Sequence, residues 1–151
     1  MKFLLMVAIA AVWLFADTKK IVFDLTTGDI ETFQTRFLTG APSTIDYFQK
    51  QGDTVKAAVI VHGNAYKFFV DHLENTKYGI DANLSARQED LHRRLEEMSR
   101  KYGIVIEVCQ AGMARNGILK EDLYPFAGTV RSAMVGLVRW QSEGYAYIPI
   151  P

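Results

Sequence analysis

Cys109, the single cysteine of this sequence, is the residue best suited to nucleophilic chemistry. It follows the apolar run 104–108, which is typical of a strand, and precedes the small-residue segment 110–116, which favours a short helix. A thiol between a strand and a helix lies near unpaired backbone N–H groups, which lower its pKa from about 8.5. The position therefore predicts a reactive thiolate, and an inert buried cysteine is the alternative.

Arg115 gives this region the Cys-x5-Arg spacing of cysteine phosphatases, in which a loop cradles phosphate and the arginine binds its oxygens. Asn116, however, occupies the place of the usual Ser or Thr, and the sequence has no Asp-Pro general-acid motif. A phosphatase is therefore the less favoured interpretation. Since there is one cysteine, the chain can form neither an internal disulfide nor a cysteine-rich zinc site.

His62 follows a second apolar run, 55–61, where a neutral imidazole could act as a general base or as a metal ligand. The three histidines of the chain form no recognisable ligand spacing, so we expect no metal. The segment 26–28 could receive an anion at a helix N-terminus, but it matches neither a dinucleotide-binding motif nor a P-loop. We therefore predict no cofactor. For His62, the alternative is a histidine that is simply hydrogen-bonded at a strand edge.

Short apolar strands alternate with helices along the chain, and no linker or repeat divides them. The predicted strands are 19–25, 55–61, 104–108, 129–130 and 145–148. The predicted helices are 30–38, 45–52, 65–73, 85–101, 111–116 and 132–140, with an interruption at 40–43 and a polar loop at 74–83. Strands as continuously apolar as 59–61 favour a mainly parallel sheet with helices on both faces, which is a three-layer α/β/α sandwich.

Polar residues follow three of these strands at the point where each strand ends. Because the carboxyl ends of parallel strands meet at one edge of a sheet, we expect these side chains to converge there. They are Asp24 with Thr26 and Thr27, His62 with Asn64, and Cys109.

The N-terminal segment 1–16 has a different character, because Lys2 is followed by fourteen residues without a charge. A positive start, a short apolar stretch and a small residue at its end predict a secretory signal peptide, too short for the roughly 20 residues of a membrane span. We expect a domain at 17–151 that is periplasmic or secreted. The alternatives are a buried first element, an uncleaved anchor, or a cytoplasmic protein.

Composition bounds the remaining possibilities. A chain of 151 residues with 49% hydrophobic residues suits one globular domain. Seventeen basic and seventeen acidic residues give no net charge, which removes the broad attraction that a nucleic-acid binder shows. We expect no nucleic-acid partner and no stable membrane insertion of the mature chain.

Four segments in this order resemble the DsrE/DsrF-like (TusD-like) sulfur-relay superfamily. They are 21–23, 59–63, the cysteine region through Asn116-Gly117-Ile118, and 143–148, so that the resemblance covers roughly 19–150. It implies a parallel five-stranded sheet and a homo- or hetero-oligomer. It also implies that Cys109 accepts a persulfide from a sulfane donor and passes it to an acceptor, as a sulfurtransferase-like carrier. Arg115 and His62 would then assist, by stabilising negative charge and by proton transfer.

A protein of another class remains open beside this interpretation. The same fold could serve as a non-catalytic oligomeric binding module, in which Cys109 is buried and slow to react. Apolar side chains in excess of what a small domain needs favour an oligomer in either case.

Overall fold

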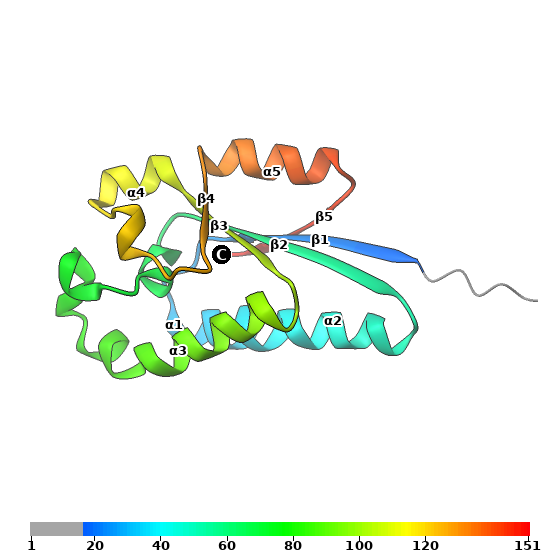
Figure 1. The fold of residues 1–151 in the computed structure, drawn as a ribbon, viewed down its shortest axis with the longest axis horizontal. Coiled ribbons are helices and arrows are strands. Elements are labelled where there is room, and N and C mark those ends of the chain that lie inside the picture. Colours follow the sequence, from blue (N-terminus) through cyan, green and yellow to red (C-terminus); the bar gives the residue numbers. More distant parts are fainter. Residues whose placement is uncertain (1–16) are drawn as a thin grey trace, which may run out of the picture.

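A computed structural model of the chain describes residues 17–151, and the predicted signal peptide at 1–16 lies outside the described residues. Five parallel strands form the central sheet, in the order β4-β3-β2-β1-β5 (Figure 1). They are β1 (Thr18–Leu25), β2 (Thr54–Val61), β3 (Val105–Cys109), β4 (Gly128–Val130) and β5 (Ala146–Ile150). The five predicted strands are therefore confirmed, with ends that differ by one or two residues.

Helices cover both faces of the sheet (Figure 1). On one face lie α1 (Ile30–Thr32), α2 (Gly40–Lys50) and α3 (Ala82–Arg100); on the other lie α4 (Gln110–Asn116) and α5 (Ala133–Ser142). Short 3-10 turns at Ala65–Phe69, Leu73–Asn75, Lys77–Ile80 and Lys120–Asp122 complete the connections. The predicted three-layer α/β/α sandwich is confirmed.

Strand residues alternate between two cores, which explains why the central strands are apolar throughout. Ile21 and Phe23 belong to the larger core, which also holds the buried side chains of α2 and α3. Val22 and Ile60 belong to a smaller core against α5. Gly136 allows α5 to approach the sheet closely, because a Cβ there would lie 2.7 Å from Ile60 Cδ1.

The predicted interruption at 40–43 is wrong, because the chain stays helical from Ile30 to Lys50. The segment Phe33–Thr39 is a π-helix that runs directly into α2. Pro42 is the third residue of α2 and has no backbone N–H to donate to the preceding π-helical turn, so the helical chain continues past it with one backbone hydrogen bond fewer. The sequence pattern around Gly40 and Pro42 therefore marks a change of helix type rather than a break.

The region 65–83 is also less regular than predicted. Only 65–69 of the predicted helix 65–73 is helical, as a 3-10 turn, and the predicted loop 74–83 contains two further turns. α3 begins three residues earlier than expected because the Asp81 carboxylate accepts a hydrogen bond from the Leu84 N–H at 3.0 Å and caps the helix.

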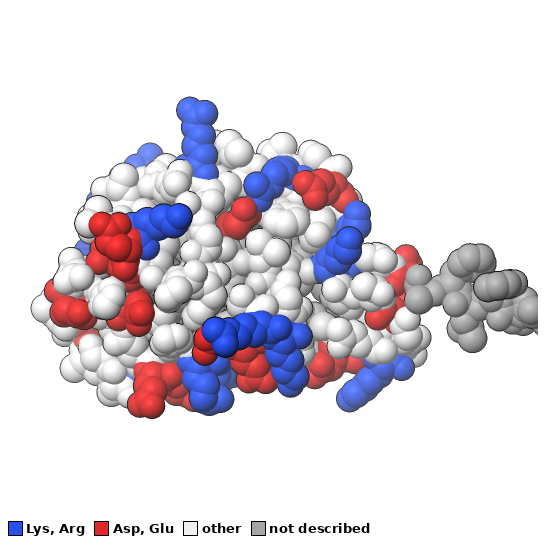
Figure 2. Space-filling model, viewed as in Figure 1, with Lys and Arg blue, Asp and Glu red and all other residues white. Residues whose placement is uncertain are grey.

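Basic and acidic side chains lie next to one another along the edge that α3 forms (Figure 2). Two ion pairs between residues four apart form on this helix, Glu96 with Arg100 at 2.9 Å and Glu97 with Lys101 at 3.2 Å. These exposed pairs are typical of a solvated helix face. Among the described residues, no helix has the length and apolar character needed to cross a membrane.

The larger core gives a test of the fold. Phe37 is fully buried, with ring centroids 5.7 Å from Phe23 and 5.8 Å from Phe33, whereas Tyr47 is 60% exposed. We expect Phe37→Ala to lower the free energy of unfolding by about 3–5 kcal/mol, because it removes apolar contacts and leaves a cavity. Tyr47→Ala should change it by less than about 1 kcal/mol. Urea denaturation followed by circular dichroism measures both, and equal losses would contradict the described core.

Candidate functional site

Cys109 is the last residue of β3 and the N-cap of α4. Alternation along β3 puts its side chain on the same side as Glu107, whose carboxylate accepts hydrogen bonds from Arg139 and Trp140 of α5. At this strand end the thiol also packs against the larger core. The residue is only 6% exposed. The thiol is thus nearly covered, at the edge of the sheet where the strands end.

Burial by itself would raise the pKa of the Cys109 thiol. The Tyr66 hydroxyl, followed by the backbone N–H of Gly112, outweighs this effect, and the pKa is lowered. The N–H groups of Ala133 and Ala111 add to the lowering. Ala111 and Gly112 lie in the first turn of α4 and Ala133 begins α5, so the thiol faces the N-termini of two helices, where N–H groups favour a negative charge. The Ala111 N–H also donates to the Arg131 carbonyl oxygen at 3.3 Å.

Tyr66 packs against α4 next to Cys109. Its one hydroxyl proton is donated to the Cys109 carbonyl oxygen at 3.1 Å; when the thiol ionises, the same proton can turn to the sulfur, which is how the hydroxyl lowers the pKa of the thiol. The side chain is almost fully buried. Gly112 makes room for it, because a Cβ at that position would overlap the Tyr66 hydroxyl. Glycine at position 112 is therefore required for Tyr66 to pack beside Cys109.

His62 lies just beyond the end of β2, next to Cys109 in the continuation of the register that pairs Val61 with Val108. Its Nε2 atom lies 2.6 Å from an oxygen of Asp24, and the Tyr147 hydroxyl donates to the other Asp24 oxygen at 2.6 Å. Since a carboxylate can only accept hydrogen bonds, the proton between His62 and Asp24 is carried by Nε2. None of the hydrogen bonds among residues 17–151 joins His62 to the sulfur.

Asp24 is the charged centre of this second cluster. Burial would raise the pKa of its carboxyl group, but the hydrogen bonds from His62 and then Tyr147 lower it below the ordinary value of 3.8. The carboxylate side chain is 12% exposed, so the group is largely removed from water in its charged form. A fixed carboxylate of this kind orients the imidazole ring.

Arg115 lies in the last turn of α4, at the end remote from Cys109. Because the segment Gln110–Asn116 is a regular helix, the two residues are separated by about 9 Å along its axis, and no loop of the phosphatase kind surrounds the thiol. The arginine still acts on this region. Burial raises the pKa of Tyr66 well above its ordinary value, and the charge of Arg115 opposes that rise.

Tyr66 and Tyr147 were not singled out by their sequence positions. Tyr66 stands in an apolar helical segment and Tyr147 in a predicted strand, so both patterns indicate packing rather than a hydroxyl near a charged group. The contacts of Asp24, His62 and Cys109 at one sheet edge, in contrast, follow the expected convergence of strand ends.

An open parallel sheet with helices on both faces, and a single cysteine that caps a helix at the carboxyl edge, define an α/β protein with a thiol site. The model of the DsrE/DsrF-like family matches residues 20–150. The chain belongs to this family, which confirms the resemblance seen in the sequence.

Two individual proteins are also similar to this chain. An uncharacterized protein of Aquifex aeolicus (strain VF5) is 25% identical over 156 residues, and the match covers 99% of this chain and 64% of that protein. This chain therefore spans less than two thirds of the relative's length. The structure of MTH1491 from Methanobacterium thermoautotrophicum, a protein of unknown function, is similar with a TM-score of 0.63 at 18% identity. It covers 87% of this chain and 98% of MTH1491, which supports the fold.

The Asp24 cluster predicts a pH-dependent contribution to stability. A carboxyl group whose pKa is lowered in the folded state stabilises the folded protein at pH values above its ordinary pKa of 3.8. This contribution is lost as the pH falls through the lowered pKa of the folded state. We expect Asp24→Asn to lower the free energy of unfolding by about 1–2 kcal/mol at about pH 7, and by much less well below pH 3.8. Urea denaturation at both pH values measures this, with Asp46→Asn as the control. A loss that is equal at both pH values would contradict it.

The Tyr66 hydroxyl predicts a measurable effect on the thiol. Tyr66→Phe removes a donor that lowers the pKa of Cys109, so the pH midpoint of alkylation by iodoacetamide should rise. At about pH 6.5 the rate should fall by about three- to tenfold, the effect of one lost hydrogen bond. Tyr102→Phe, which removes a hydroxyl that faces Asp46 instead, is the matched control. An unchanged midpoint in Tyr66→Phe would show that the hydroxyl does not stabilise the thiolate.

Proposed function

We propose that the protein is a sulfur carrier in which Cys109 takes up a sulfane sulfur as a persulfide and passes it on. Family membership indicates a role related to sulfur relay. The observation that carries the finer proposal is the environment of the thiol, whose pKa is lowered between the N-termini of two helices although the residue is buried. A thiolate is the form that attacks sulfur.

The uptake step needs a thiolate and a donor with a sulfur–sulfur bond. With thiosulfate, the Cys109 thiolate attacks the outer sulfur, a new S–S bond forms, the old S–S bond breaks, and sulfite leaves with the bonding electrons. In delivery, an acceptor thiolate attacks the outer sulfur of the persulfide and the Cys109 thiolate leaves. A thiol that is 6% exposed favours a small donor over a bulky one.

Arg115 and His62 have supporting roles in this proposal. The Arg115 charge, which acts on the region of Tyr66, stabilises the anionic donor as it approaches. His62, oriented by Asp24 through Nε2, moves a proton at the neighbouring strand end. The experiment below tests whether Cys109 takes up sulfur and does not test either supporting role.

Intact-mass spectrometry after incubation with thiosulfate or polysulfide tests the proposal. We expect the wild type to gain about 32 Da per sulfur, and Cys109→Ser to gain nothing. Since a sulfinic acid also adds about 32 Da, each sample is split and treated with dithiothreitol, which removes a persulfide sulfur but leaves a sulfinate. No adduct, an adduct that resists dithiothreitol, or an equal adduct on Cys109→Ser would overturn the proposal.

The second candidate is a non-catalytic oligomeric binding module, and two observations favour it. Cys109 is buried, and three apolar side chains of α5 are exposed, Met134 by 77%, Val138 by 64% and Val135 by 51%. Slow labelling of Cys109 by iodoacetamide at about pH 6.5, with fast labelling only on denaturation, would favour this module over the carrier. A homo-oligomer and an exported, periplasmic or secreted location remain predictions.

A further inference from the structure

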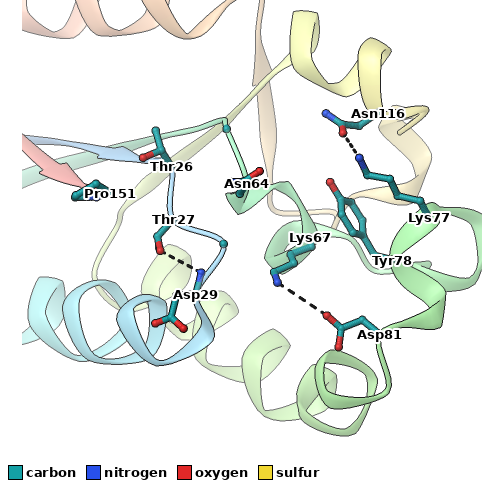
Figure 3. Close-up of a pocket in the computed structure, with 12 residues that line it drawn as sticks. Thr26, Thr27, Asp29, Asn64, Lys67, Lys77, Tyr78, Asp81, Asn116 and Pro151 are labelled. Carbon is teal, nitrogen blue, oxygen red and sulfur yellow. Dashed lines mark hydrogen bonds and ion pairs between the residues drawn. The ribbon is translucent and has the colours of Figure 1, made fainter.

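A cleft of about 890 Å³ lies beyond the carboxyl ends of β1 and β2, apart from the thiol (Figure 3). Its walls come from five parts of the chain, which are the loop 26–29 after β1, the segment 63–67 after β2, the region 77–81 before α3, Asn116 at the end of α4, and Pro151 after β5. None of the three predicted site residues lines it. In open α/β sheets this edge is where ligands bind, and the volume suits a small organic molecule.

Two glycines bring the loops after β1 and β2 into direct contact at one end of the cleft. A Cβ on Gly28 would lie 2.7 Å from Asn64 Cβ, and a Cβ on Gly63, whose φ is +64°, would lie 3.1 Å from the Thr26 backbone oxygen. Neither glycine N–H donates to any group in the described part of the chain, and the Thr26 hydroxyl and the Asn64 side-chain amide also have no partner there, although the Asn64 backbone N–H donates to the Thr26 carbonyl oxygen. This end of the cleft therefore presents several free hydrogen-bond donors close together.

Two lysines add positive charge along the same cleft (Figure 3). Lys67 stands beside the glycine end, since it shares the wall of a smaller adjoining cavity with Gly28 and Asp29. Its Nζ lies 3.9 Å from Asp81, at the outer limit of an ion pair. Lys77 donates to the side-chain oxygen of Asn116, which is uncharged. Lys77 therefore has no acidic partner in the described part of the chain, whereas Lys67 is shared loosely between Asp81 and Asp29, whose pKa its charge helps to lower.

The two carboxylates of the cleft are engaged with the backbone. Asp29 accepts a hydrogen bond from the Thr32 N–H at 2.7 Å and caps α1, and Asp81 caps α3 in the same way. These bonds satisfy the carboxylates within the protein. They do not satisfy the donors at the glycine end, which would match a ligand with several acceptor oxygens and a negative charge.

We propose that this cleft binds a phosphate ester of a small organic molecule. The phosphate oxygens accept from the N–H groups of Gly28 and Gly63, from the Thr26 hydroxyl and from Lys67. The organic part extends toward Tyr78 and Lys77, whose side chains lie at the opposite end in Figure 3. A neutral ligand would leave the clustered donors unpaired, and a metal ion would find donors where it needs ligands.

Isothermal titration calorimetry on the full chain tests the proposal with two phosphate esters, AMP and ribose 5-phosphate, and with adenosine as the probe that lacks phosphate. We expect both esters to bind and adenosine to bind at least about tenfold more weakly, because it lacks the charged acceptor group. Thr26→Val and Lys67→Gln should each weaken the binding of both esters by about tenfold. Lys50→Gln, at the exposed end of α2, is the matched control and should bind as the wild type does.

The outcome is separable from that of the sulfur proposal. Thr26→Val and Lys67→Gln should keep the unfolding midpoint and the alkylation rate of Cys109, because neither side chain is among the groups that contact the thiol. If neither ester binds at millimolar concentration, if adenosine binds as tightly as AMP, or if both variants bind like the wild type, the cleft is not a phosphate site. Each of these results leaves the sulfur experiment unaffected.

Discussion

Backbone hydrogen bonds pair β1 with β2 and β2 with β3 in parallel, with Leu25 opposite Val61 and Val61 opposite Val108. This register brings the strand ends to one edge in step, so that residues distant in sequence become neighbours. The contact of His62 with Asp24, 38 positions apart, exists only in this register. A shift of one residue would turn either side chain to the other face of the sheet. The chemistry of the edge therefore depends on backbone hydrogen bonds between the strands.

At Cys109, two opposing physical effects meet. Burial disfavours a charged thiolate, while the Tyr66 hydroxyl and the N–H groups at the starts of α4 and α5 favour it, and the second effect is larger. Gly112 is necessary to this balance, because any side chain there would displace Tyr66. Cys109 is therefore buried and yet has a lowered thiol pKa. Its small exposed area limits the approach of large partners.

The thiol and the cleft occupy different sides of the same edge. Cys109 and Glu107 lie toward α5, whereas the cleft opens between the loops after β1 and β2 and the start of α3. α4 spans the interval, with the thiol at its first turn and Asn116, a wall of the cleft, at its end. α4 therefore contributes to both the thiol site and the cleft. A substitution in one of these two regions does not contact the other.

The sequence by itself determined the layer architecture, because continuous apolar strands between helical segments can only be buried by a parallel sheet with two covered faces. It also determined that Cys109 ends a strand and begins a helix, since both patterns are local. It did not determine the helical path through Gly40 and Pro42, where tertiary packing overrides two residues that usually end helices. Only the tertiary structure decided that Tyr66 lies beside the thiol, that His62 bonds to Asp24, and that two loops enclose a cleft. These contacts join residues far apart in the chain, and no local pattern of spacing encodes them.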